Sequence, residues 1–146
     1  MAQTYIGSTL RTGSGTLTDS IDGGYVVVSQ TSTVTTSAAG DATSISFTIP
    51  ASAQLLNFLV DMVTIPSFGT ATTVPATIGT TAGGSQYLTI ADASLTGRTT
   101  PVFTAAQLTA MSNIGTNQTV VFTIDPNGTI ATPGVFRLTV VYAQKV

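Results

Sequence analysis

The chain has 146 residues, a suitable length for one domain spanning 1–146, and it contains neither cysteine nor histidine. Missing cysteine excludes disulfides, thiolate catalysis and cysteine-bound zinc. Four basic and six acidic residues give a net charge of −2; the basic ones are too few and too scattered for a nucleic-acid surface, and low net charge favours association.

Threonine is the commonest residue, whereas among the residues that favour exposed helix Glu is absent and Lys and Arg are scarce. Because β-branched residues suit a pleated surface, this composition predicts an all-β domain. The first residues, MAQTYIGSTLRTG, have no basic segment leading into an apolar core, so we expect no secretory signal. No apolar run reaches the roughly 18–20 residues that span a bilayer, so we expect no membrane contact.

The N-terminal region allows two interpretations. Residues 4–10, TYIGSTL, are one candidate for a further strand, and RTGSGT follows at 11–16. Residues 1–20 are either an extended arm that packs on a neighbouring molecule or a flexible terminus. A Gly-rich turn, DGG at 22–24, precedes a strand predicted at 25–36, and TSISFTI then alternates Ile45, Phe47 and Ile49 inward.

The most apolar passage, FTIPASAQLLNFLVDMVTI at 47–65, fits a strand or a helix by period. The flanking Pro50 and Pro66 and the strand-rich surroundings favour a strand at 55–65. Its predicted inward face contains Leu56, Phe58, Val60 and Met62, and its other face contains Leu55, Asn57, Leu59, Asp61 and Val63. We interpret Asp61 as a solvent-facing or edge position that discourages aggregation between sheets.

Further strands are predicted at 72–79, 86–90, 118–125 and 134–144. Pro75 has no N–H, so the first of them should be an edge strand or begin after a break. The last places Phe136, Leu138, Val140 and Tyr142 on one face. A single short helix is predicted near 104–111, with Thr104 as its N-cap, lying across a barrel end or a sheet edge.

Strong turn signals separate these strands, and no strand–helix–strand alternation links them. The predicted fold is therefore a jelly-roll-like antiparallel β-sandwich.

Chemical sites are weakly indicated. Without His, Cys or Glu we expect no enzyme, because a catalytic site needs a tuned base beside its nucleophile. Calcium could bind aspartates and loop oxygens, although no EF-hand loop is present. For Asp125 and Asn127, turn formation is the preferred interpretation. The calcium candidates are Asp19, Asp22, Asp41, Asp92 and Asp125 with Asn127.

Four tyrosines could form a sugar-binding surface, but tryptophan is absent. We prefer to interpret most of them as residues at a core margin or a subunit interface. They are Tyr5, Tyr25, Tyr87 and Tyr142.

A resemblance covers residues 43–90 and 134–144. SISFTIP, then ASAQLLNFLVDMVTI, then ATIGTTAGGSQYLTI, and finally GVFRLTVVYAQ resemble small β-sandwich proteins encoded in the structural gene modules of tailed bacteriophages. The resemblance implies a virion protein on the capsid surface, specifically a decoration (cement) protein. Such a protein would bind the major capsid protein as a homo-oligomer, often a trimer, without catalytic residues or a cofactor.

We assign a candidate interface to Tyr5, Ile6, Leu10, Arg11 and Phe68 and expect no metal site. Two alternatives remain open. One is a carbohydrate- or receptor-binding jelly-roll module on a virion, and the other is a calcium-dependent adhesive domain.

Overall fold

A computed structural model of the chain describes residues 11–12, 15–16, 25–51, 53–94, 97–99, 101–112 and 116–145. The predicted strand at 4–10 lies outside these ranges. The first strands are β1 (Arg11–Thr12), β2 (Gly15–Thr16), β3 (Tyr25–Thr35), β4 (Thr43–Ile49), β5 (Ala53–Thr64) and β6 (Ser67–Phe68). The remaining elements are β7 (Ala76–Gly79), β8 (Leu88–Ile90), β9 (Arg98–Thr99), α1 (Ala105–Met111), β10 (Gln118–Ile124), β11 (Ile130–Thr132) and β12 (Val135–Lys145).

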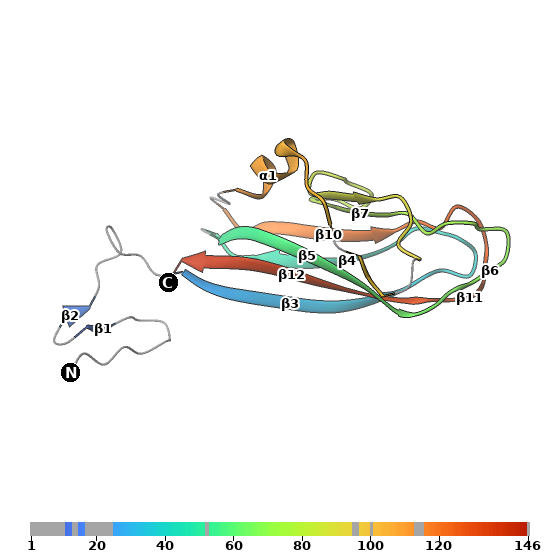
Figure 1. Cartoon of the computed structure of the whole chain (residues 1–146), viewed down its shortest axis with the longest axis horizontal. Coiled ribbons are helices and arrows are strands. Elements are labelled where there is room, and N and C mark those ends of the chain that lie inside the picture. The colour runs from blue at the N-terminus through green and yellow to red at the C-terminus, as the bar shows by residue number, and fades with distance from the viewer. Residues whose placement is uncertain are drawn as a thin grey trace.

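Two four-stranded antiparallel sheets form a sandwich (Figure 1). The first sheet has the order β3-β12-β5-β9, and the second has the order β4-β10-β7-β8. The chain passes repeatedly from one sheet to the other, so that consecutive strands of the sandwich lie in different sheets, except for β7 and β8, which pair within the second sheet. Eight strands connected in this way make a jelly roll, which confirms the predicted fold class. A short ribbon of β6 and β11 lies at one end.

Alternation along β12 builds the centre of the core. Phe136, Leu138, Val140 and Tyr142 are buried, as their spacing of two predicts. Phe47 and Ile49 from β4 are also buried, and Ile45 packs against them at the margin. β12 lies between β3 and β5, so it can bury one face only by this strict alternation.

The inward face of β5 was predicted correctly for Phe58 and Val60, and Met62 packs at the core margin. The prediction was wrong for Leu56, which is 40% exposed, whereas the neighbouring Leu55 is only 2% exposed. The cause is a β-bulge. Tyr142 stands opposite Leu55 and Val141 opposite Asn57, so Leu56 has no partner on β12 and the alternation changes phase there.

The strand predicted at 72–79 is shorter than expected because β7 begins at Ala76, directly after Pro75. β7 lies between β10 and β8, where a missing N–H would break the ladder. A start after a break, one of the two predicted outcomes, is therefore the observed one. Pro75 still contributes its carbonyl, which accepts a hydrogen bond from the Asp125 N–H at 3.0 Å.

The single helix of the described residues is α1, and its predicted N-cap is confirmed. The Thr104 hydroxyl accepts from the Gln107 N–H, and the Gln107 side chain accepts from the Thr104 N–H. This capping box satisfies N–H groups that a first helical turn leaves free. The helix contacts β5 and buries Met111. Just before the helix, the ring of Phe103 packs edge-on against the ring of Phe58, with 6.3 Å between the ring centroids. With seven residues the helix is too short to cross a membrane.

Candidate functional site

The predicted interface residues do not gather in the described part of the chain. Tyr5, Ile6 and Leu10 lie outside the described residues, as does the side chain of Arg11, whose backbone belongs to β1. Phe68 lies in β6 at one end of the sandwich, opposite Ile130, and is 39% exposed. The candidate interface therefore stays a prediction.

The three described tyrosines do not form a shared platform for a sugar. Tyr87 and Tyr142 are buried in the core, Tyr25 is exposed at the start of β3, and Tyr5 lies outside the described residues. The Tyr142 hydroxyl accepts a hydrogen bond from Gln30 at 3.0 Å. Burial raises the pKa of Tyr87, and Gln118 lies close enough to oppose that shift without forming a hydrogen bond of good geometry.

The described calcium candidates do not form one cluster of acidic side chains. Asp92 accepts hydrogen bonds from the Val74 N–H at 3.1 Å, the Ser94 N–H at 2.9 Å and the Ser94 hydroxyl at 2.6 Å. Burial alone would raise the pKa of Asp92, but these donors outweigh it and the pKa is lowered. This carboxylate therefore joins the loop after β8 to the segment that leads into β7, and all three hydrogen bonds go to one of its two oxygens, Oδ1.

Asn127 also binds the backbone: its side-chain oxygen accepts hydrogen bonds from the N–H groups of Thr72 and Thr73. Asp41 and Asp125 are exposed at separate turns, and Asp19 and Asp22 lie outside the described residues. Within the described ranges, no three acidic side chains come together as a metal site would require.

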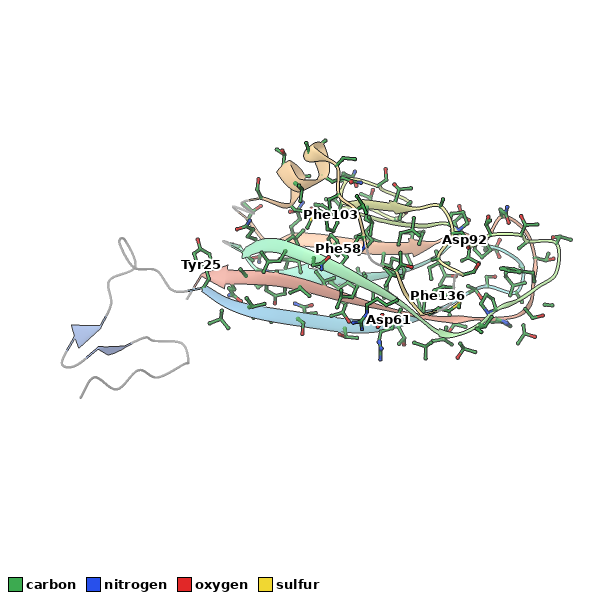
Figure 2. The ribbon with its side chains drawn as sticks, viewed as in Figure 1. Tyr25, Phe58, Asp61, Asp92, Phe103 and Phe136 are labelled. Atoms are coloured by element: carbon green, nitrogen blue, oxygen red, sulfur yellow. The ribbon has the colours of Figure 1, made fainter. Side chains whose placement is uncertain are left out.

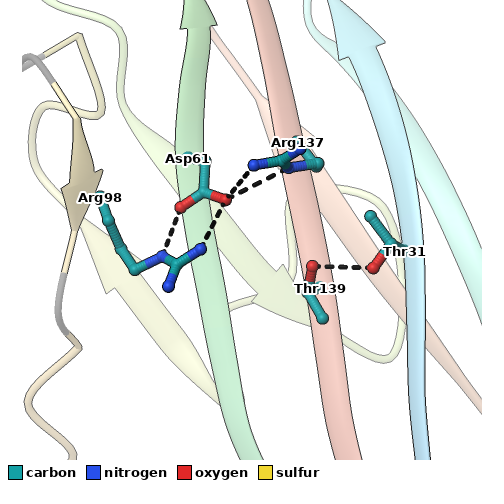
Figure 3. A network of polar contacts seen from close by, with 5 residues as sticks. All are labelled: Thr31, Asp61, Arg98, Arg137 and Thr139. Atoms are coloured by element: carbon teal, nitrogen blue, oxygen red, sulfur yellow. Dashed lines mark hydrogen bonds and ion pairs between the residues drawn. The ribbon is translucent and has the colours of Figure 1, made fainter.

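The burial of Asp61 differs from the prediction of a solvent-facing or edge position. Asp61 points away from the core but is only 7% exposed, because Arg98 of β9 and Arg137 of β12 close over it (Figure 3). Arg98 donates from Nε to Oδ1 at 2.6 Å and from Nη2 to Oδ2 at 3.0 Å. Arg137 donates from Nη2 to Oδ2 at 2.9 Å.

These hydrogen bonds stabilise the ionised carboxylate. Arg98 contributes most, burial opposes it, and Arg137 adds to it, so the pKa of Asp61 falls from 3.8 to about 2. The cluster joins three strands of the first sheet and holds the two-residue β9 against β5. The cluster could not be predicted from the sequence, because nothing local relates Asp61 to arginines 37 and 76 residues away.

The outer face of the first sheet, defined as its side away from the core, is rich in small and β-branched residues. Thr31 and Thr139 share a hydrogen bond of 2.8 Å between their hydroxyls, beside Leu59 (Figure 3). The next row contains Ser29, Val141 and Asn57. Apart from the Asp61 cluster, the described side chains on this face carry no charge.

The second sheet carries a hollow of about 330 Å³ on its own outer face. Its base includes Thr123, whose hydroxyl bonds to Ser44 at 2.9 Å and accepts from the Gly83 N–H at 2.9 Å. The loop around Gly83 thus folds back over the sheet. The lining is Ala42, Ser44, Pro75, Thr77, Ala82, Gly83, Thr123 and Asp125.

Comparison with known proteins identifies no relative: no family model, no curated protein and no solved structure matches this chain.

Proposed function

We propose that this protein is a virion structural protein, a capsid decoration protein that binds the major capsid protein through the outer face of its first sheet. The observation that carries the proposal is that broad outer face, on which threonine, serine and aliphatic side chains surround one ion cluster, where Arg98 and Arg137 share the Asp61 carboxylate and leave a net charge of +1. The resemblance of residues 43–90 and 134–144 to phage structural proteins supports it from the sequence.

The physical reason is the low desolvation cost of such a face. Burying a charge against a partner is expensive unless it is paired, whereas threonine and valine surfaces can be covered without that penalty. The guanidinium groups of Arg98 and Arg137 are already paired with Asp61. Because contacts repeat over a symmetric shell, each one can be modest and avidity supplies the rest.

The test is binding to capsid shells that lack this protein, taken from a tailed phage that carries its gene. Wild-type protein should co-sediment with the shells. L59D and V141D place a charge in the middle of the outer face and should weaken binding by at least about tenfold, equivalent to about 1.4 kcal/mol. V102D is the matched control, because Val102 is 88% exposed and precedes α1.

Two results would sink the proposal. One is wild-type protein that does not bind the shells, and the other is L59D and V141D binding as well as V102D. Circular dichroism of each variant shows whether the sandwich is intact before binding is measured.

A carbohydrate-binding module on a virion is the second candidate, favoured by the hollow on the second sheet. Its hydroxyls from Ser44 and Thr77 and the carboxylate of Asp125 are the kinds of group that bind sugar hydroxyls. A glycan array tests it: a specific signal that T77F abolishes would support this function, while a blank array would refute it. Thr89, next to Thr77 on β8 but not among the residues that line the hollow, provides the control variant T89F.

A further inference from the structure

We propose that the free edge of β3 pairs with β3 of a second copy, antiparallel and centred on Thr31, so that two first sheets become one continuous eight-stranded sheet. This goes beyond the proposed capsid contact, which uses the face of the sheet and not its edge. It also predicts a twofold dimer, in contrast to the trimer that the family resemblance implies.

The direction of the backbone groups of β3 follows from its pairing with β12. The Thr36 N–H donates to the Gly134 carbonyl at 3.0 Å, and the register between the two strands continues without interruption. In an antiparallel pair, residues with both groups toward the partner alternate with residues whose groups point away. The even-numbered residues therefore bond to β12, and Val27, Ser29, Thr31, Thr33 and Thr35 direct their N–H and C=O groups outward.

These outward groups have no hydrogen-bond partner in the described part of the chain. β3 is eleven residues long, YVVVSQTSTVT, and has none of the features by which edge strands avoid pairing. It contains no charged residue and no proline, and its register with β12 shows no bulge. A long, regular, uncharged edge of this kind is suited to accept another strand.

The inner side of β3 is already held in place. The Gln30 amide donates to the Thr48 carbonyl of β4 at 3.1 Å and to the Tyr142 hydroxyl at 3.0 Å. These two hydrogen bonds connect β3 to β4, the edge strand of the second sheet, and to its own neighbour β12. The edge is therefore preorganised, which lowers the entropic cost of adding a strand.

A second copy is the occupant that this edge fits best, because the edge is complementary to itself. With Thr31 opposite Thr31 of the partner, Ser29 stands opposite Thr33 and Val27 opposite Thr35. All of these residues have outward backbone groups, so each exchanges both hydrogen bonds. Cross-strand threonine pairs stabilise sheets, and Thr31 already makes such a pair with Thr139 inside the molecule.

The first experiment measures mass by analytical ultracentrifugation of the full chain. Wild-type protein should be dimeric at about 100 µM, a concentration that populates even a dimer with a micromolar dissociation constant. T31P removes an outward N–H that β12 does not use, so the fold should persist while dimerisation weakens at least about tenfold. T31A is the control: it loses the hydroxyl, retains the N–H and should remain dimeric.

Charge exchange at the same position tests the twofold register. T31K and T31D each place like charges opposite each other on the dimer axis and should both be monomeric. Mixed in equal amounts, they should form a heterodimer, because the introduced lysine of one chain would then face the introduced aspartate of the other. Recovery on mixing would not occur if Thr31 were distant from the axis.

Amide hydrogen exchange keeps the test decisive if T31P fails to fold. In wild-type protein, the Ser29, Thr31 and Thr33 amides should exchange more slowly at high protein concentration than at low concentration, while the Gln30 and Ser32 amides are slow at both. A wild-type chain that is monomeric at about 100 µM overturns the proposal, whether or not another part of the same chain covers the edge. So does a T31P variant that remains dimeric.

The two proposals can fail separately. Monomeric protein that binds shells would overturn the β3 dimer and leave the capsid function standing. A dimer that ignores shells would do the reverse.

Discussion

Asp61 shows how a single buried carboxylate can be made favourable on the outside of a sheet. Two arginines from different strands occupy both of its oxygens, so it stays ionised although it is nearly covered (Figure 3). Because both arginines are about half exposed, water screens part of the attraction. The cluster therefore contributes about 1–2 kcal/mol, less than a fully dry network would.

We expect D61N to lower the free energy of unfolding by about 1–2 kcal/mol at pH 7. Since folding lowers the pKa of Asp61 to about 2, the contribution is fully present above the ordinary pKa of 3.8 and is lost as the pH falls through about 2. Urea unfolding at pH 7 and at low pH measures this difference, which should shrink in acid.

The matched control is D41N, since the Asp41 carboxylate is exposed and its one hydrogen bond within the described residues comes from the Ser37 hydroxyl at 3.5 Å. It should leave the urea midpoint unchanged. A D61N midpoint equal to that of D41N at pH 7 would show that the arginine cluster contributes nothing to stability.

Two buried tyrosines differ in whether the hydroxyl has a hydrogen-bond partner. The Tyr87 hydroxyl has no hydrogen-bond partner within the described residues, whereas the Tyr142 hydroxyl accepts a hydrogen bond from Gln30. The ring of Tyr87 packs on Phe58, which is labelled in Figure 2. Y87F should therefore be neutral or stabilising by up to about 1 kcal/mol, and Y142F should destabilise by about 1 kcal/mol. Thermal unfolding of both variants decides this, and equal losses would contradict the assignment.

At the scale of the element, the bulge in β5 decides which of two adjacent leucines enters the core. Before the bulge Leu55 points inward, and after it Phe58 and Val60 do. An uninterrupted strand with the same sequence would have to expose Leu55 or Phe58, since residues an odd number of positions apart face opposite sides of a regular strand. The extra residue, Leu56, lets the strand bury both.

We expect L55A to cost about 2–5 kcal/mol, because it leaves a cavity in the core, and L56A to cost less than about 1 kcal/mol. The two variants remove the same atoms from neighbouring positions, so each is the other's control. Denaturant unfolding measures both. A larger loss for L56A would mean that the bulge lies elsewhere and that the predicted inward face was right.

For the whole molecule, the jelly roll demands pairings between distant parts of the chain. β3 pairs with β12, at the far end of the sequence, and β10 must find both β4 and β7. Loop closure must precede each of these contacts, so folding should be slow.

Refolding followed by tyrosine fluorescence should take about 0.01–10 s, the range of β-sandwich domains, and not microseconds. A chain that ends at Gly134 lacks β12 and should show no cooperative unfolding, because β12 joins β3 to β5. A cooperative transition in this truncated chain would mean that the first sheet survives without its central strand.

The features that the sequence determined by itself are local ones. Pro75 delays the start of β7, Thr104 with Gln107 begins α1, and alternation places four residues on one face of β12: Phe136, Leu138, Val140 and Tyr142. Each depends on residues within a few positions of one another, where backbone geometry and the missing proline N–H act directly.

Only the tertiary structure decided the rest. The bulge at Leu56 depends on how β5 aligns with β12, and the burial of Asp61 depends on two arginines brought in from other strands. The edge of β3 that has no partner among the described residues depends on strand order, which no property of YVVVSQTSTVT specifies. In a jelly roll nearly every strand takes its neighbours from distant sequence, so which side of a strand is covered is settled by topology and not by local pattern.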